Sequence, residues 1–177
     1  MKALRCGSAE PEEQVKSIFM NKDKLDKIKA YTLHLDNLDS LSPSNDEDRE
    51  IIEQSKKATN YLLSHPWCVG IKNGWLGISW DYMVCVFLYE IDSDNPEVDQ
   101  FIWMIVGDLP SAYIDIESAS NSEEALRCYV DIMGEWVNAI ENGASTEACY
   151  PLEVPATSEY AQMLKGRLEL IEEELAA

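Results

Sequence analysis

The chain has 177 residues and a formal net charge of −19 at pH 7, with 33 Asp and Glu against 14 Lys and Arg. A surface of this sign disfavours direct binding to nucleic-acid phosphates and to anionic membranes, which attract proteins through Lys and Arg. The hydrophobic fraction of 46% excludes a chain that is disordered by composition, and it allows one folded domain over residues 1–177.

The acidic charge is concentrated in the last two thirds of the chain. Residues 1–57 carry 10 Lys and Arg against 12 Asp and Glu, whereas residues 58–177 carry 4 against 21, which leaves 4 − 21 = −17 in that part. Carboxylates without nearby cations repel one another, and their field attracts a basic partner and speeds the encounter with it. The asymmetry therefore favours a protein that binds a basic partner.

Residues 9–64 are predicted to be mainly helical. Apolar residues at helical spacing predict helix over 9–40, either as one helix or as two divided near Asn21, and the turn residues of 40–45 predict a loop. Asn45 is placed to cap a further helix, which we expect to end before Pro66.

Residues 67–116 are predicted to form an antiparallel meander of four to five strands. Asn73-Gly74 is the dipeptide typical of a two-residue hairpin turn between two of these strands. Residues 82–91 are apolar at both alternating sets of positions, which predicts a central strand covered on both faces. The expected strands are 67–71, 75–80, 82–91, 101–106 and 112–116.

Trp75 and Trp80 differ in parity along the predicted strand 75–80. On a regular strand they point to opposite faces of the sheet, so we expect one of them to be exposed or covered by another element. An exposed Trp at a sheet face is a typical anchor for a protein partner.

Residues 121–175 are predicted to form two helices. Asn121 is placed to cap the first helix, with Glu124 in the position of a capping box, and Thr157 begins the second. The order of helices, meander and helices predicts an α+β fold, in which the antiparallel sheet packs with N-terminal and C-terminal helices. The expected apolar stripe of the last helix is Tyr160, Leu164, Leu168, Ile171 and Leu175.

Four segments resemble a small bacterial family of unknown function: Trp103-Met-Ile-Val-Gly-Asp-Leu-Pro-Ser-Ala-Tyr-Ile114, Ala125-Leu-Arg-Cys-Tyr129, Glu135-Trp-Val137 and Val154-Pro-Ala-Thr-Ser-Glu-Tyr-Ala161. The resemblance covers roughly the C-terminal half and implies that these segments form one unit. It brings no catalytic residues with it. In its acidic α+β character the chain is also similar to toxin-neutralising immunity proteins.

The chain start and the cysteines bear on the compartment of the protein and on metal binding. The segment 1–14 has no apolar stretch of signal-peptide length, and the longest apolar run, 83–89, is too short to span a bilayer, so we expect a cytoplasmic protein. The five cysteines are odd in number and scattered without C-x-x-C, which favours free thiols. His65 and Cys68 have the spacing of two metal ligands, but the sequence supplies no further pair, so we expect neither metal nor cofactor.

Two groups of carboxylates are candidate sites. One is a loop between two strands that projects a negative patch, with Asp92, Asp94, Glu97 and Asp99. The other is Asp108, Asp115 and Glu117; the last two share a face if both lie on a strand, and with Asp108 they could form a cluster for acid–base chemistry. The alternative for this second group is the polar face of an edge strand.

These patterns predict a non-enzymatic cytoplasmic binding protein that neutralises a basic protein partner, most concretely an immunity protein against a toxin nuclease, whose phosphate-binding cleft is basic. The alternatives are a phage-type inhibitor that imitates nucleic acid, a small enzyme that uses the second carboxylate group, and an acidic scaffold whose charge maintains solubility. The predicted partner-binding residues are Asp92, Asp94, Glu97, Asp99, Asp108, Asp115, Glu117, Trp75 and Trp80.

Overall fold

The computed structural model describes residues 32, 34–81 and 83–177. Contacts within the chain divide it into two compact units, Met1–His34 and Leu35–Ala177. The second unit is described below. The helix predicted to begin at residue 9 lies outside the described residues as far as residue 31, and one domain over 1–177 stays a prediction.

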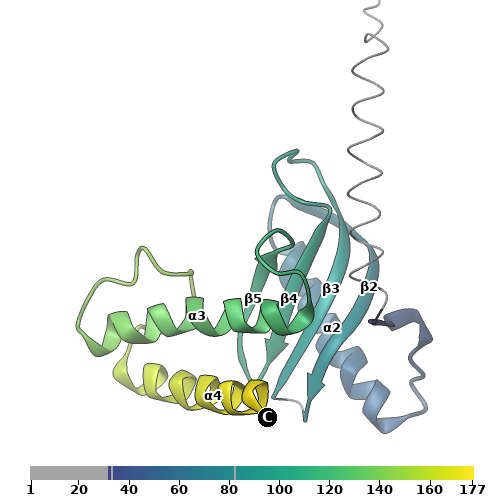
Figure 1. The fold of residues 1–177 in the computed structure, drawn as a ribbon. Coiled ribbons are helices and arrows are strands. Elements are labelled where there is room, and N and C mark those ends of the chain that lie inside the picture. The colour runs from purple at the N-terminus through teal and green to yellow at the C-terminus, as the bar shows by residue number, and fades with distance from the viewer. Residues whose placement is uncertain (1–31, 33, 82) are drawn as a thin grey trace, which may run out of the picture. The chain divides into compact units, whose positions relative to one another are not determined.

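The second unit has the predicted α+β fold, a five-stranded antiparallel meander in which, in the described part of the chain, one α-helix lies between the first two strands and two follow the last strand (Figure 1). Neighbouring strands follow one another in sequence from β1 to β5. The elements are β1 (Asp36–Asn37), the 3₁₀ helix η1 (Leu38–Ser40), α2 (Asp46–Leu63), β2 (Cys68–Trp80), β3 (Val84–Ser93), β4 (Phe101–Gly107), β5 (Leu109–Asp115), α3 (Ser122–Glu141) and α4 (Ser158–Ala176).

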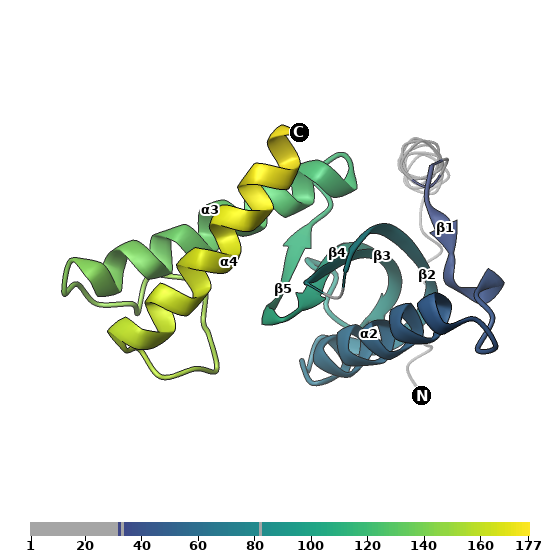
Figure 2. The same ribbon diagram turned by 90° about the horizontal axis from the view of Figure 1, so that it is seen from below.

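Helices cover both faces of the sheet, and α4 packs on α3 (Figure 2). On one face, Ala58 and Leu62 of α2 lie in one core with Phe87 and Met104. On the other face, the indole of the buried Trp103 donates a hydrogen bond of 3.0 Å to the carbonyl of Ala119, just before α3. This arrangement confirms that β3 is central and covered on both faces, because its residues 84–89 are all buried.

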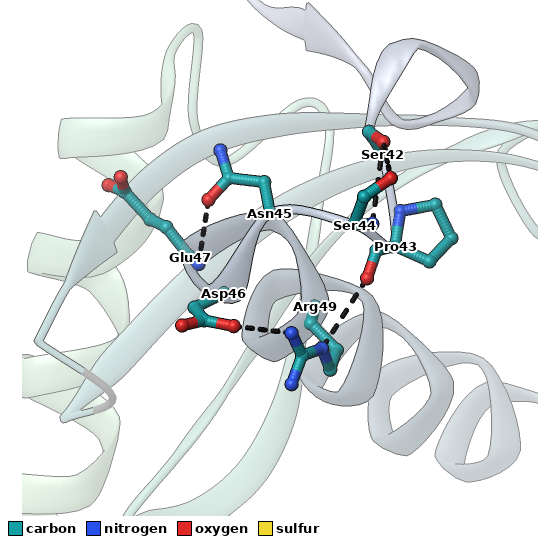
Figure 3. Close-up of polar contacts among 7 residues, drawn as sticks. All are labelled: Ser42, Pro43, Ser44, Asn45, Asp46, Glu47 and Arg49. Carbon is teal, nitrogen blue, oxygen red and sulfur yellow. Dashed lines mark hydrogen bonds and ion pairs between the residues drawn. The ribbon is translucent and has the colours of Figure 1, made fainter.

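The predicted helix starts are confirmed by their caps. Asn45 accepts a hydrogen bond of 3.1 Å from the backbone N–H of Glu47, next to the ion pair of Asp46 with Arg49 (Figure 3). The side chains of Asn121 and Thr157 cap α3 and α4 in the same way. Local capping chemistry therefore sets where all three of these helices begin.

The predicted hairpin at Asn73-Gly74 is wrong, because both residues lie in the middle of the long strand β2 and pair with Glu90 and Tyr89. Asn73 donates a hydrogen bond of 2.6 Å to the Glu90 carboxylate. A Cβ on Gly74 would lie 2.7 Å from both the Leu38 side chain and the Tyr89 ring. The glycine thus serves a close approach of side chains rather than a turn.

The predicted helix over 9–40 is also wrong at its end. Asp36 and Asn37 form the short strand β1, which pairs with Leu76 and Trp75 of β2. The side chain of Asn37 then caps η1 by accepting a hydrogen bond of 2.8 Å from the backbone N–H of Asp39. Backbone pairing with β2 and this local cap take the place of the predicted α-helix at residues 36–40, although the apolar spacing continues to Leu38.

Candidate functional site

The acidic loop between β3 and β4 is exposed at three of its four predicted site residues, Asp92, Asp94 and Glu97. Asp92 forms an ion pair with Lys72 of the neighbouring strand. The contact with the Asp92 carboxylate raises the pKa of Lys72 above its ordinary value, because it favours the charged ammonium form. The loop lies at the end of the sheet where β3 finishes and β4 begins.

The structure does not bring Asp108 together with Asp115 and Glu117. Asp108 precedes β5, and Asp115 ends that strand of seven residues, so about 20 Å of extended chain separates them. Glu117 lies beyond the strand, inside a turn in which Ser118 N–H donates to the Asp115 carbonyl. Asp108 instead forms an ion pair with Arg167 of α4. A single carboxylate cluster of these three residues is therefore wrong.

Trp75 and Trp80 lie on the same face of the sheet, so the prediction from their parity is wrong. A bulge between Leu76 and Ile78 shifts the register of β2, and Trp75 then pairs with Leu88 while Trp80 pairs with Val84, two positions of equal parity on β3. Both indoles are half-buried. The Trp75 ring stacks on Phe101 with a centroid distance of 6.3 Å, which leaves Trp80 as the candidate anchor.

His65 lies in a cluster of aromatic rings. Its ring centroid is 4.9 Å from that of Tyr61, 5.1 Å from Trp67 and 5.4 Å from Tyr113. Its Nδ1 is 2.8 Å from the Tyr61 carbonyl. Among the described residues, no group of three His, Cys, Asp or Glu side chains is placed to hold a metal ion. The contacts of His65 are those of a packing residue.

The described cysteines are free thiols in varied settings. Cys68 and Cys85 are buried, Cys128 and Cys149 are partly buried, and Cys6 lies outside the described residues. Burial raises the pKa of the Cys85 thiol, which keeps it in the neutral, unreactive form.

Helix α4 carries an exposed apolar stripe that the sequence prediction missed. Of the five large hydrophobic side chains that are exposed in the described part of the chain, Tyr160, Met163 and Leu170 lie on this helix, with exposed fractions of 41%, 62% and 44%. Their spacing of three and seven residues places them, with Arg167, along one side of α4. Leu164, Leu168 and Ile171 are buried as predicted, but Tyr160 is wrongly included in that stripe.

A pocket of about 330 Å³ lies beside the first half of this stripe. Leu109 and Pro110 at the start of β5, Trp136 of α3, Val154 and Met163 form its apolar lining, and the ion pair of Asp108 with Arg167 closes one side. The volume falls at the lower end of the range of roughly 300–1,000 Å³ that small-molecule pockets occupy. It suits one or two large apolar side chains.

A second pocket, of about 500 Å³, lies beside the other end of the stripe. Its lining includes Trp80, Met83 and Leu170, together with the carboxylates of Asp81, Glu173 and Glu174. We call the two pockets the apolar pocket and the acidic pocket.

The two pockets adjoin along α4. Asp108 of the apolar pocket donates its backbone N–H to the carbonyl of Met83 in the acidic pocket, over 3.1 Å. On the helix, Arg167 and Leu170 are three residues apart and therefore neighbours. We name the whole surface the α4 groove, with the apolar pocket at one end, the Asp108–Arg167 pair between, and the acidic pocket at the other end.

Sequence reasoning found two residues of the α4 groove, Trp80 and Asp108, but did not place them together. Arg167 lies 59 residues from Asp108 in the chain, so only the packing of α4 beside the start of β5 could join them. A signal for the stripe was present, because Met163 and Leu170 are apolar and seven residues apart. It was hidden by the stronger buried stripe that runs beside it.

A family model described as Domain of unknown function (DUF4826) matches residues 70–174, which is more than half of the chain. All four segments of the resemblance noted in the sequence lie within this range. No curated protein and no solved structure matches the chain. In the part of the chain that the structure describes, none of the helices has an apolar stretch capable of crossing a bilayer.

Proposed function

We propose, from the premise that the chain belongs to the DUF4826 family, that it is a cytoplasmic binding protein that neutralises a basic protein partner. The most concrete version is an immunity protein that binds the basic cleft of a toxin nuclease. No catalytic chemistry is needed for such a role, since occupying the partner's cleft is enough to block it.

The observation that carries this proposal is that the few Lys and Arg side chains of residues 58–177 already have partners within the chain. The four cations there face 21 carboxylates, and each cation has a partner within the chain. Lys72, Lys165 and Arg167 form ion pairs with Asp92, Glu141 and Asp108, and Arg127 donates to the carbonyl of Leu175. These four cations offset at most four of the 21 carboxylates of residues 58–177, so this part of the chain keeps a net charge of 4 − 21 = −17, and its field favours a basic partner.

The alternatives have less support from these observations. A small enzyme built on Asp108, Asp115 and Glu117 requires carboxylates that converge, and these three lie at opposite ends of β5. An inhibitor that imitates nucleic acid would use the same negative field and the same class of basic partner, so it differs from the proposal in the origin of the partner rather than in its chemistry.

The test uses the purified product of the gene that neighbours this one. Its association with the chain is measured by surface plasmon resonance at about 50 mM and about 500 mM NaCl, and its own activity is measured with the chain in equimolar amount. We expect the association rate to fall at least about tenfold at high salt, because screening weakens long-range attraction. We also expect the partner's activity to be lost.

A partner that binds with a salt-independent rate would contradict the electrostatic mechanism. A partner that binds but keeps its full activity would contradict neutralisation. Conversion of a small substrate by the chain itself, abolished in Asp108→Asn, would favour the enzyme.

A further inference from the structure

We infer that the α4 groove is the surface that receives the partner, and that its occupant is a basic segment with one apolar side chain for the apolar pocket and one Lys or Arg for the acidic pocket. This inference rests on the proposed function and names the surface and the partner chemistry that carry it out.

The exposed apolar area on α4 requires an explanation. Met163 and Leu170 are 62% and 44% exposed, although the same helix buries a complete stripe against α3. Scattered single hydrophobic residues are ordinary, but a row of three on one side of a helix, beside a concave apolar pocket, is typical of a protein-binding surface. The row therefore marks the side of α4 that a partner covers.

The charge of the groove selects the occupant. The charged residues that line its two pockets are Arg167 against Asp81, Asp108, Glu173 and Glu174, which gives 1 − 4 = −3. Arg167 is already paired with Asp108, so three carboxylates at the acidic pocket have no cation among the lining residues. Two of them, Glu173 and Glu174, lie at the C-terminal end of α4, where the helix dipole adds further negative potential. A second copy of this acidic chain would be repelled.

Trp80 gives the acidic pocket an aromatic wall beside its carboxylates. A Lys or Arg side chain packs favourably over an indole face, and the carboxylates then contact its charged end. At the other end, the apolar pocket accepts a Leu, Met or aromatic side chain.

The length of the groove sets the spacing of the two anchors. Met163 and Leu170 are seven residues apart on α4, which is about 10.5 Å along the helix axis. A segment in the polyproline II conformation covers about the same distance in three residues, and its side chains return to the same side every three residues. The occupant therefore carries its apolar anchor and its cation three residues apart in that conformation, or seven apart if it is helical.

The first experiment uses a defined probe, the peptide Lys-Lys-Leu-Ser-Ser-Arg-Lys and its reversed sequence, titrated into the full chain with isotope-labelled tryptophan. We expect the indole N–H resonances of Trp80 and Trp136 to shift on addition of one of the two peptides. The resonance of Trp103 should stay in place, because its indole is buried and bonded to Ala119. A peptide of the same composition with adjacent Leu and Arg should bind more weakly. Unchanged Trp80 and Trp136 resonances would overturn the inference.

Matched variants separate the local effect from net charge. Glu173→Gln with Glu174→Gln removes two charges from the acidic pocket, and Glu169→Gln with Glu172→Gln removes two from a different side of the same helix. We expect about fivefold weaker peptide binding for the first pair, from about 0.5 kcal/mol per exposed ion pair, and less than half that effect for the second. Equal losses would show that only net charge matters, and would overturn the groove as the site.

A further variant distinguishes failure of the groove from failure of the proposed function. Met163→Glu places a charge at the apolar pocket and should weaken binding of the neighbouring gene's product at least about tenfold, with an unchanged melting temperature because the side chain is exposed. Unchanged binding and inhibition would overturn the groove and leave the proposed function standing. No binding of that product to the unmodified chain would overturn the proposed function itself. A dimer that Met163→Glu abolishes would assign the groove to a second copy instead.

Discussion

Gly77 of β2 lies against Ser122, the first residue of α3, so closely that a Cβ on Gly77 would be 2.6 Å from the Cβ of Ser122. Gly77 is also the residue at the bulge that shifts the register of β2 between Leu76 and Ile78. One glycine therefore serves the contact between sheet and helix and lies at the irregularity that places Trp75 and Trp80 on one face.

Gly77→Ala should lower the free energy of unfolding by about 1–3 kcal/mol, because the added methyl group overlaps Ser122 in a packed contact. Urea denaturation should show a lower midpoint with an unchanged slope. Gly70→Ala in the same strand is the control, since its Cβ would meet Asp92 at an ordinary 3.8 Å. Adding Ser122→Gly to Gly77→Ala should recover part of the loss. A similar loss in Gly70→Ala would mean that any side chain in β2 is costly.

Tyr150→Phe should remove a hydrogen bond that protects the edge strand of the sheet and should lower the free energy of unfolding. In the described part of the chain β5 is an edge strand, and the Tyr150 hydroxyl accepts a hydrogen bond of 3.3 Å from the backbone N–H of Tyr113 on that strand. The same hydroxyl shares a hydrogen bond of 3.1 Å with Tyr61. Loss of the hydroxyl leaves a partly buried N–H unsatisfied, which costs about 1–2 kcal/mol.

The specific readout for Tyr150→Phe is amide hydrogen exchange at Tyr113, which should become faster than exchange at the neighbouring amides. Tyr160→Phe, at an exposed position on α4, is the matched control and should leave stability unchanged. If exchange at Tyr113 keeps its native rate, another group protects that edge.

Glu124→Gln should remove a contribution to folding stability that is present at neutral pH and is lost in acid. The Glu124 carboxylate accepts hydrogen bonds of 2.6 and 2.8 Å from the hydroxyl and backbone N–H of Ser120, and these bonds lower the pKa of Glu124 below its ordinary value of 4.5. A lowered pKa in the folded state means that the contribution is present above pH 4.5. It is lost as pH falls through the lowered value.

Thermal unfolding of the unmodified chain and of Glu124→Gln over a pH series checks the pH dependence of the Glu124 contribution. The melting temperature of Glu124→Gln should lie below that of the unmodified chain at pH 7, and the difference should shrink steadily as the solution is acidified below pH 4.5. Glu123→Gln, in the same first turn of α3, controls for the general effect of a charge near the helix start. A difference that is constant with pH would refute a role for the ionised carboxylate.

Much of the fold follows from local chemistry in the sequence. Asn45, Asn121 and Thr157 each accept a backbone hydrogen bond within three residues, so their roles as caps depend on no distant contact. The central strand β3 was also predictable, because a strand covered on both faces has apolar residues at every position.

The predictions that were wrong concern features that depend on contacts between residues far apart in the chain. Asn73-Gly74 has the local signature of a turn, but Gly74 lies under Leu38, which is far away in the chain, and that packing keeps the strand continuous. The parity of Trp75 and Trp80 was changed by a bulge at Gly77 whose reason is a contact with α3. The α4 groove likewise requires α4, β5 and the end of β2 to meet. Tertiary contacts decided each of these, and no local pattern encodes them.

Trp80→Ala should raise the rate at which the partner dissociates from the chain. A Trp at the wall of a docking pocket is a typical hot spot, and its truncation commonly costs about 2 kcal/mol or more, which is roughly thirtyfold in affinity. We expect most of this loss in the dissociation rate, measured by surface plasmon resonance against the neighbouring gene's product. Trp75→Ala, on the same face but stacked on Phe101, should change folding stability more than binding. A larger effect on dissociation from Trp75→Ala would move the anchor away from the α4 groove.

The acidic loop between β3 and β4 and the α4 groove can be told apart by charge reversal. Asp94→Lys with Glu97→Lys, both at exposed positions of the loop, should change the association rate at about 150 mM NaCl by less than about twofold. The loop lies about 30 Å along β3 from the acidic pocket, several times the screening length of about 8 Å. Glu173→Lys with Glu174→Lys introduces the same charge at the groove and should slow association about tenfold. If instead the loop variant slows association more, the loop with Asp92, Asp94, Glu97 and Asp99 faces the partner.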